Sequence, residues 1–282
     1  QLVSQATKAT LPLDLESSLQ GLTNGNPFFL LEIARLESNI HSLTQIRIPR
    51  ELESILDQRI NLLKDDEDII SMAALLGLNG DKRILLLSLA FLGVEESVIT
   101  DALIRAERIG LLALKIEQYN FSHALFTQRL ISRMSYVQRS AYHGAAAVTL
   151  ARETRFQAAM AHLSQSEKSV DLDIAQSLAQ SALQISQSIG DHASITESCV
   201  WLLENTEHAT LERIQLLIHL AKSQIALGRR VEGRKNAELA STLARTLNDA
   251  ELEAEAVMQW AARSDFTPDR APIISAFERI KR

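Results

Sequence analysis

The segment TNGNPFF, residues 23–29, has the composition of a loop that could contact a nucleotide. Gly25 and Asn26 favour a tight turn, and Pro27 suits the first turn of a helix, where free backbone N–H groups can bind an anion. The chain contains no GxxxxGK[ST] sequence, which is the loop that binds the phosphates in P-loop proteins. The segment therefore does not predict a phosphate-binding loop.

Other residue patterns that could support catalysis or metal binding are missing from the sequence. The seven histidines form neither an HExxH motif nor a pair with cysteine, and no serine lies in a GxSxG sequence. The single cysteine, Cys199, allows neither an intramolecular disulfide nor a thiolate metal cluster, which suits a reducing cytoplasm. We predict no catalytic residue and no metal site, and we do not expect the chain to be an enzyme by itself.

Charge also limits the possible partners. The formal net charge is −6 and the pI about 5.7, so contact with nucleic acid would need a local basic patch. The best candidate, RRVEGRK at 229–235, is interpreted as a solvated helix face. The acidic run at 65–68 could bind a metal, but carboxylates are also favoured at a helix start by the helix dipole, and we favour that interpretation.

The spacing of the prolines predicts a helical chain. No proline occurs between Pro49 and Pro268, in a sequence rich in alanine, leucine, glutamine and glutamate. A helix is predicted from residue 49, a second follows the acidic run and ends at Gly77, a third covers about 82–92, and a fourth ends at Gly110. Two more are predicted at about 122–134 and 135–153. The pattern LLALKIEQYNFS, residues 111–122, alternates apolar and polar residues around Glu117-Gln118 and predicts one β-hairpin.

From about residue 154 the sequence predicts stacked helices with small residues at their contacts. The segment AQSALQISQSIGD (179–191) is similar to AELASTLARTLND (237–249), and each segment ends in a glycine or asparagine stop. Helix pairs of this kind stack into a solenoid, because each unit buries its apolar face on its neighbour.

Three stretches of the sequence resemble, in order, the central part of the STAND class of signalling ATPases, most closely the large LuxR-type transcriptional regulators of bacteria. The stretch LPLDLESSLQGLTNGNPFFLLEIARLE is similar to the end of their ATPase lid. IPRELESILDQRINLLKDDEDIISMAALLG is similar to the start of the winged-helix-like domain that follows. YNFSHALFTQRLISRMSYVQRSAYHGAAAVTLA is similar to the end of that domain, with the patterns FxHxL (Phe121, His123, Leu125) and RxxxH (Arg139, His143).

This resemblance implies a nucleotide site divided between domains. In the family the lid proline lies against adenine and a histidine of the winged-helix domain reaches the diphosphate, which implies Gly25, Asn26, Pro27 and His123 as nucleotide-binding residues. Thr127 departs from the arginine common at its position, so a contact made by that arginine is in doubt. The structural alternative, which we favour for the chain by itself, is that Pro27 only starts a helix and His123 packs under the hairpin.

The resemblance also implies the organisation and function of the chain. The expected fold is mainly α: the helical end of an ATPase lid (1–48), a winged-helix-like regulatory domain with one β-hairpin (49–152), and a tetratricopeptide-like α-solenoid (153–282). The chain would be the regulatory and sensor part of a cytoplasmic, nucleotide-switched transcriptional regulator. The repeats would receive a small inducer or a protein partner and signal to the protein's own ATPase domain.

The start of the chain, QLVSQATKAT, has neither a Met nor a signal peptide, so we expect a piece of a longer protein. ADP or ATP would bind to the complete protein. The piece itself needs no cofactor. No apolar run is long enough to span a bilayer, so no membrane partner is expected.

Two other functions are possible from the sequence. A scaffold that binds a protein at its helical repeats, without any nucleotide, requires nothing beyond the repeat pattern. Direct DNA reading would depend on Gln128, Arg129 and Arg133, but the leucine spacing of their helix suggests burial. We do not expect the chain itself to bind nucleic acid.

Overall fold

The structure is a computed structural model, and it describes residues 50–207, 210–261 and 271–280. These residues are mainly helical and include one small antiparallel sheet, which confirms the expected mainly-α class. The chain divides into two compact units, Gln1–Thr149 (the N-terminal unit) and Leu150–Arg282 (the C-terminal unit), and each is described by itself. None of the helices in the described ranges combines the length and the hydropathy needed to span a bilayer.

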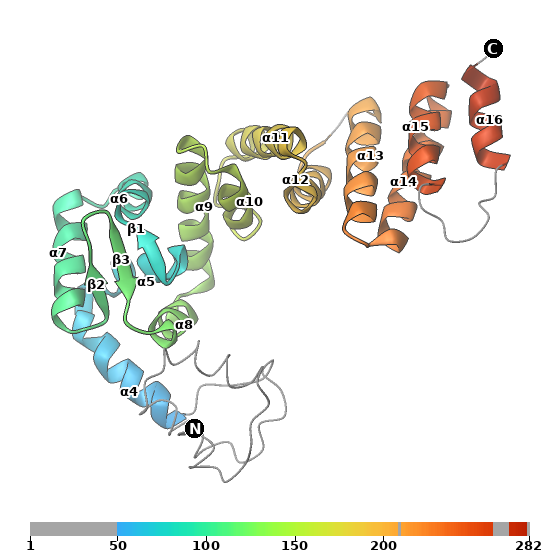
Figure 1. Cartoon of the computed structure of the whole chain (residues 1–282). Coiled ribbons are helices and arrows are strands. Elements are labelled where there is room, and N and C mark those ends of the chain that lie inside the picture. Colours follow the sequence, from blue (N-terminus) through green and yellow to red (C-terminus); the bar gives the residue numbers. More distant parts are fainter. Residues whose placement is uncertain (1–49, 208–209, 262–270, 281–282) are drawn as a thin grey trace, which may run out of the picture. The chain divides into compact units, whose positions relative to one another are not determined.

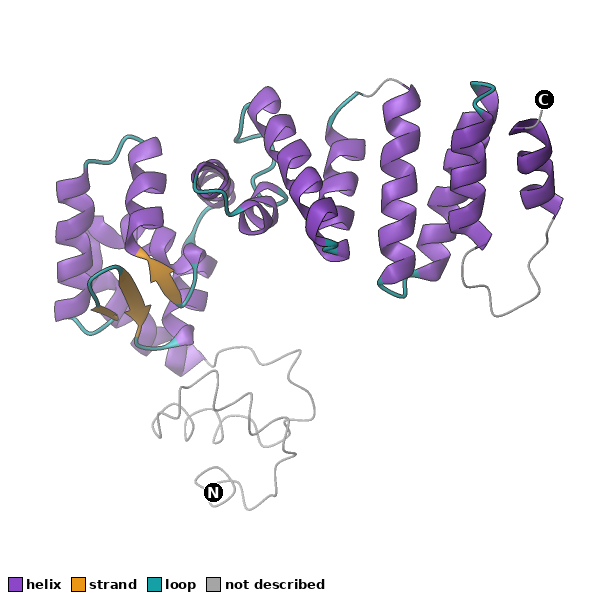
Figure 2. Cartoon of the chain, turned by 45° about the horizontal axis from the view of Figure 1, so that its top comes forward, coloured by secondary structure: helices purple, strands orange, loops and turns teal. Residues whose placement is uncertain are grey.

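The N-terminal unit surrounds its sheet with helices (Figures 1 and 2). Its order is α4 (Arg50–Ile60), the 3-10 helix η2 (Asn61–Asp66), α5 (Glu67–Leu76), β1 (Asn79–Asp81), α6 (Lys82–Phe91), α7 (Glu96–Arg108), β2 (Leu112–Leu114), β3 (Gln118–Phe121), α8 (Ala124–Arg133) and α9 (Tyr136–Arg152). The predicted stops lie where expected: Gly77 follows α5 with φ 129° and Gly110 follows α7 with φ 72°. Both backbone conformations favour glycine, which has no Cβ.

The sheet corrects the expectation of a lone hairpin. Strands β2 and β3 do form the predicted hairpin, but β1 also pairs with β3, so the strand order is β1-β3-β2 and every pair is antiparallel. The turn lies one residue earlier than expected, because Lys115 N–H donates to the carbonyl of Gln118 (2.8 Å) and Gln118 already belongs to β3. Strand β1 is only Asn-Gly-Asp, and so short a polar segment gives no period-2 signal.

Tyr119 fixes the sheet against α5. Its ring is fully buried, and its hydroxyl donates to the carbonyl of Ala73 (2.8 Å). The ring passes over Gly80, its partner residue in β1, so closely that a Cβ built on Gly80 would lie 2.0 Å from the ring carbon Cζ. The burial raises the pKa of the Tyr119 hydroxyl, which therefore stays protonated and able to donate.

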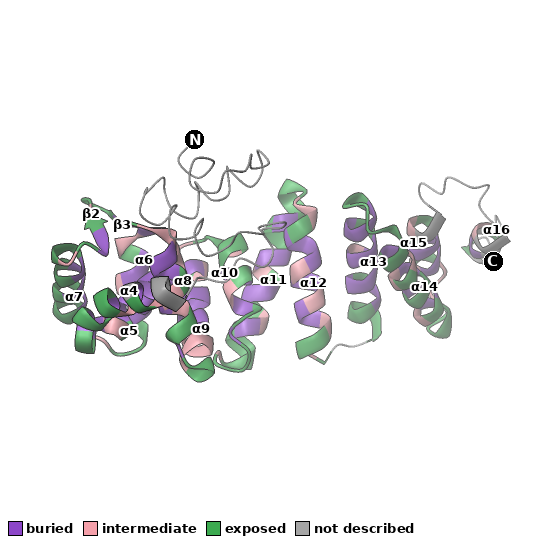
Figure 3. Cartoon of the chain, turned by 90° about the horizontal axis from the view of Figure 1, so that it is seen from below, coloured by how far each residue is buried: buried purple, intermediate pink, exposed green. Residues whose placement is uncertain are grey.

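The C-terminal unit is an array of helices that pack in sequence order (Figure 1). The helices are α10 (Phe156–Leu163), α11 (Leu172–Ile189), α12 (His192–Asn205), α13 (Thr210–Ala226), α14 (Arg230–Thr246), α15 (Ala250–Ala261) and α16 (Ala271–Ile280). Helix α10 also contacts α12, and α13 also contacts α15, so the array is more than a chain of neighbouring pairs. Figure 3 shows that α11 to α15 each carry both buried and exposed positions.

The turns between helices use the stops that the sequence predicted. Gly190 (φ 72°) and Asn248 (φ 56°) adopt left-handed backbone conformations, and an aspartate follows each of them. Asp191 accepts hydrogen bonds from the N–H groups of Ala193 and Ser194 and so caps α12, while Asp249 accepts from Leu252 N–H (3.0 Å) at the start of α15. The same two-residue device ends one helix and begins the next at both places.

The position of these turns does not fit a strict two-helix repeat. The two similar segments at 179–191 and 237–249 end α11 and α14, which are three helices apart. A repeat of two helices would place equivalent segments an even number of helices apart. The expected small residues do mediate the helix contacts: Ala182, Ala240 and Ala244 are buried, and a Cβ on Gly233 would lie 2.6 Å from Ile225 Cγ1 across the contact of α13 and α14.

Candidate functional site

Of the predicted nucleotide-binding residues, His123 alone lies in the described part of the chain. Gly25, Asn26 and Pro27 fall outside the described residues, so their placement relative to His123 stays a prediction. The expected end of the ATPase lid, residues 1–48, lies outside the described residues as well.

His123 is the N-cap residue, immediately before the first residue of α8. Its backbone is extended (φ −150°, ψ 141°), and its carbonyl accepts a hydrogen bond from Phe126 N–H (3.1 Å). Its half-buried ring lies 6.4 Å from the Phe126 ring, centroid to centroid, and its side chain does not cap the helix. The backbone N–H groups at the start of α8 are therefore not blocked by the His123 side chain, and that is the geometry at which helices bind anions.

Ser122 anchors this helix start to the rest of the sheet region. Its hydroxyl lies 2.9 Å from the carbonyls of both Gly110 and Leu111, and its N–H donates to the Leu111 carbonyl (2.9 Å). The start of α8 is thus held directly against the junction of α7 and β2. Thr127, the residue that departs from the family pattern, is buried and donates to the Ala124 carbonyl (2.7 Å), so its hydroxyl is used within α8.

The two arginines of α8 are used in ion pairs inside the unit. Arg129 binds Asp57 of α4 with two hydrogen bonds (2.8 and 2.6 Å). Arg133 also binds Asp57 (2.9 Å), and its Nε contacts Glu67 of α5 at 2.7 Å. The hydrogen bonds from Arg129 lower the pKa of Asp57, and those to Asp57 raise the pKa of Arg129. The charges of both arginines are therefore satisfied by protein carboxylates.

The acidic run at 65–68 has a role that the helix-dipole argument did not include. Glu67 and Asp68 do lie in the first turn of α5, as expected. In addition, three members of the run contact other helices. Asp66, the last residue of η2, binds Arg105 of α7 (2.5 and 2.7 Å). From α5, Glu67 binds Arg133 and Asp68 accepts from the Gln138 side chain (2.7 Å). Across the residues that the structure describes, no group of three or more His, Cys, Asp or Glu side chains has the arrangement of a metal site.

The exposed side of α7 carries more acidic than basic groups. Glu96, Asp101 and Glu107 are exposed there, and of the two arginines in this helix Arg105 is bound to Asp66. Glu107 also accepts a hydrogen bond from Leu114 N–H (2.7 Å), which joins α7 to the hairpin. This surface lacks the excess of free basic side chains that DNA backbone binding requires.

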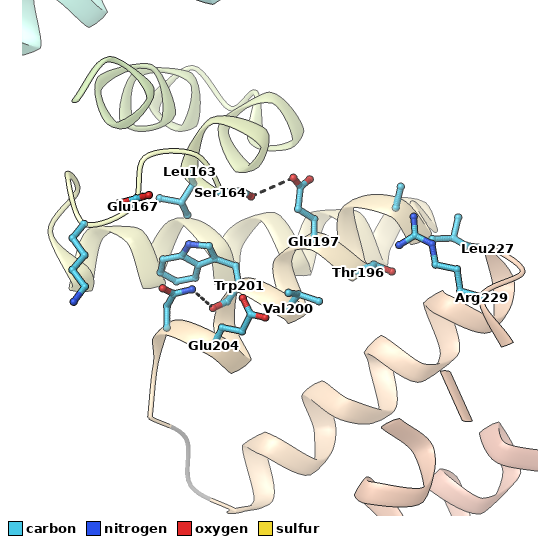
Figure 4. Close-up of a pocket in the computed structure, with 13 residues that line it drawn as sticks. Leu163, Ser164, Glu167, Thr196, Glu197, Val200, Trp201, Glu204, Leu227 and Arg229 are labelled. Atoms are coloured by element: carbon cyan, nitrogen blue, oxygen red, sulfur yellow. Dashed lines mark hydrogen bonds between the residues drawn. The ribbon is translucent and has the colours of Figure 1, made fainter. Parts of the chain in front are cut away.

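The C-terminal unit contains a groove that sequence reasoning missed. It has a volume of about 900 Å³ and lies between α12, the loop after α10 and the turn between α13 and α14 (Figure 4). Its floor is one face of α12, formed by Thr196, Glu197, Val200, Trp201 and Glu204. The lining residues of α12 recur at intervals of three and four positions, as one face of a helix does. The groove itself depends on the loop and on the α13–α14 turn, which no local pattern predicts.

A smaller depression of about 290 Å³ lies between α11 and α13 and includes His219. Burial lowers the pKa of His219, so its imidazole is mainly neutral at neutral pH. The buried thiol of Cys199 on α12 has its pKa raised to about 12 by burial, which disfavours the reactive thiolate. Comparisons with models of protein families, with curated proteins and with solved structures found no match for the chain.

Proposed function

We propose that the chain is the regulatory and sensor part of a nucleotide-switched signalling protein of the STAND type, a bacterial transcriptional regulator. In this proposal residues 49–152 control an ATPase domain, and the helices from 153 onward receive an inducer or a protein partner. The observation that carries the proposal is the order of elements in the N-terminal unit, which is followed by a helical array.

That order supports a winged-helix-like assignment. The elements run α5, β1, α6, α7, β2 and β3, and the strand order is β1-β3-β2. Helices α6 and α7 are joined by a short turn, as in a helix-turn-helix unit, and the hairpin β2–β3 would be the wing. The family resemblance of residues 49–152 implies the same domain.

The charges of this unit favour a regulatory role over DNA reading. A reading helix needs arginine, lysine or amide side chains that are free to reach base edges and phosphates. Arg129 and Arg133 are bound to Asp57 and Glu67, and the exposed side of α7 carries more acidic than basic side chains. We therefore propose that the unit contacts other protein domains.

His123 would provide the contact between this unit and the nucleotide. It begins a helix whose first N–H groups are not capped by its side chain, and an imidazole at that place can donate a hydrogen bond to a phosphate oxygen. Gly25, Asn26 and Pro27 would lie on the adenine side. A ligand that binds two domains together shifts the equilibrium between open and closed arrangements, which is how such a switch works.

The second candidate function is a scaffold that binds a partner without any nucleotide. The groove on α12 supports this alternative as well, since a groove that receives a partner requires the helical array and no nucleotide. A P-loop in the upstream coding sequence, within about 300 residues at ordinary domain size, favours the switch. Absence of that loop favours the scaffold.

The test uses the protein encoded by the complete reading frame. We expect it to retain ADP through purification, and we expect His123→Ala to lose ADP while Gln128→Ala, an exposed position on the same helix, retains it. Pro27→Ala should weaken retention as well. Equal retention by the His123→Ala protein and the unmodified protein would refute the divided nucleotide site.

A further inference from the structure

The groove on α12 has the walls of a ligand site. Apolar side chains come from all three elements that surround it: Leu163 from the end of α10, Val200 and Trp201 from α12, and Leu227 from the turn before α14. Trp201 is 8% exposed, so most of its indole is fixed in the protein and a small part faces the groove. The side chain of Asn205, the last residue of α12, donates to the Trp201 carbonyl (2.9 Å). Figure 4 shows Trp201 among the lining residues.

Two carboxylates lie along this floor on either side of Trp201. Glu197 and Glu204 both line the groove and are seven residues, about two helical turns, apart on α12. In Figure 4 the Glu197 carboxylate points toward Ser164. Neither forms an ion pair with another described residue, and Glu197 accepts only a long hydrogen bond from Ser164 Oγ (3.3 Å). A third carboxylate, Glu167, lines the groove from the loop after α10, where Lys168 follows it.

The charges of the lining are arranged unevenly. The α12 floor contributes two carboxylates and no basic group, whereas the basic residues, Lys168 and Arg229, belong to the loop after α10 and to the start of α14. The two carboxylates are about 10 Å apart along the helix axis. A cation over the floor would therefore pair directly with one of them, interact with the other at longer range, and lie beside apolar side chains. Hydrogen bonds between a charged donor and a carboxylate are stronger than those between neutral groups.

The size of the groove selects the kind of ligand. About 900 Å³ is within the range of small-molecule sites, roughly 300 to 1,000 Å³. A helix of about 10 Å diameter would need more space even at three turns. An extended basic peptide is the other possible occupant, and the experiment below distinguishes it.

We propose that the groove between α12, the loop after α10 and the α13–α14 turn binds a small organic cation, an amine with an apolar body. The ammonium group would pair directly with one of Glu197 and Glu204 and interact with the other at longer range. The apolar body would pack on Val200, Leu227 and the open part of Trp201. The inference deepens the ligand-receiving role under Proposed function and rests on it for its biological meaning. Its test uses the chain alone, so it can fail while the ADP-retention test succeeds, and the reverse.

The test measures binding of matched probes to the 282-residue chain. Trp260 is the second of its two tryptophans, so Trp260→Phe leaves Trp201 as the single tryptophan reporter. The probes are 2-phenylethylammonium, the neutral 2-phenylethanol of similar shape, the anion 3-phenylpropionate, and an extended hexapeptide with one lysine. We expect saturable quenching or enhancement of Trp201 fluorescence by the ammonium probe, with affinity at least about tenfold above that for the alcohol.

The variants assign the site. Glu197→Gln and Glu204→Gln should each weaken the ammonium probe about threefold, and the pair together about tenfold, without changing the affinity for the alcohol. Glu238→Gln, an exposed glutamate of α14 that does not line the groove, is the matched control and should bind normally. Circular dichroism of each variant verifies that the helices remain folded.

Four results would overturn the proposal. They are equal affinities for the ammonium and the alcohol, unchanged ammonium binding by the double Gln variant, tighter binding of the anion than of the ammonium, and binding of the hexapeptide when the ammonium probe shows no saturable effect at millimolar concentration. The third result would assign the groove to anions held by Lys168 and Arg229. The fourth would assign it to a basic peptide.

Discussion

Gly80→Ala should destabilise the N-terminal unit, because it adds a methyl group to a filled contact between two strands. The new Cβ would lie 2.0 Å from both Cζ and the hydroxyl oxygen of Tyr119, and that ring has no exposed surface. Because the ring cannot move toward solvent, the clash must displace Tyr119 from α5 and break its hydrogen bond to the Ala73 carbonyl. In a regular helix the N–H of Gly77 would donate to the Ala73 carbonyl, but here it donates to the Ala74 carbonyl. It therefore does not replace the hydrogen bond from Tyr119.

The expected cost is the sum of two effects. Overpacking a filled core costs about 1 to 3 kcal/mol, and loss of a buried hydrogen bond costs about 0.5 to 1.5 kcal/mol. Replacing a strand glycine returns about 0.5 to 1 kcal/mol of backbone entropy, which is the smaller term. Together these terms predict that the free energy of unfolding of this unit falls by about 0.5 to 4 kcal/mol, with a central value of about 2 kcal/mol.

Native-state hydrogen exchange in urea measures this change locally, which matters because the chain has two units. The reporting amides are Phe121 N–H, which donates to the Leu78 carbonyl, and Lys82 N–H, which donates to the Glu117 carbonyl. Amides of α13 in the other unit are the internal reference.

Gly93→Ala is the matched control, because Gly93 has no atom within 4 Å of an added Cβ but has φ +85°. It should cost only about 1 to 2 kcal/mol, from backbone strain. In a Tyr119→Ala background the Gly80→Ala cost should nearly disappear. If the cost is the same with and without the Tyr119 ring, the steric argument is wrong.

Three further predictions concern charge, packing and pH. Asp57→Ala should lower the free energy of unfolding by about 1 kcal/mol, since the ion pairs of Asp57 are partly exposed. A double-mutant cycle with Arg129→Met should give a coupling energy of similar size, and zero coupling would contradict the assigned pair. Gly233→Ala should cost about 1 to 3 kcal/mol in the C-terminal unit, because the new Cβ would lie 2.6 Å from Ile225 Cγ1, and unchanged urea unfolding would disprove that close contact. Burial lowers the pKa of His143 in the folded chain, so the unfolded chain binds the proton more readily. The free energy of unfolding should therefore fall as the pH decreases through the ordinary value near 6.5, and it should level off below the lowered pKa of the folded state. A His143→Gln variant with an unchanged dependence of stability on pH would rule this out.

The sequence predicted the helices well because their signals are local. Gly77, Gly110, Gly190 and Asn248 all stand at helix ends with positive φ, and a single residue type at one position is enough to mark each stop. Small residues at three- and four-residue steps likewise indicated the contact faces of α11 and α14. These signals did not determine how many helices make up one repeat. The similarity between the ends of α11 and α14 is visible in the sequence, but it does not show that the two are three helices apart.

Pairings between distant segments were the features that the sequence could not supply. Strand β1 has three residues, and its pairing with β3 requires a glycine at position 80, where the Tyr119 ring leaves no room for a Cβ. This contact joins two distant segments, so neither segment alone predicts it. Asp66 and Arg105 are ordinary charged residues of two predicted helices, and their pairing depends on how those helices cross. Of the candidate site, the sequence located His123 at a helix start, whereas its nucleotide role remains a prediction and the α12 groove had no local signal.

The strand order of the small sheet bears on how the protein avoids self-association. With β3 in the centre, β1 and β2 are the edge strands, and each has three residues. An incoming strand from another molecule would find few unpaired backbone groups on either edge, and Asp81 already uses its carboxylate to cap α6. Short edges of this kind let the unit keep a sheet without presenting a template for aggregation.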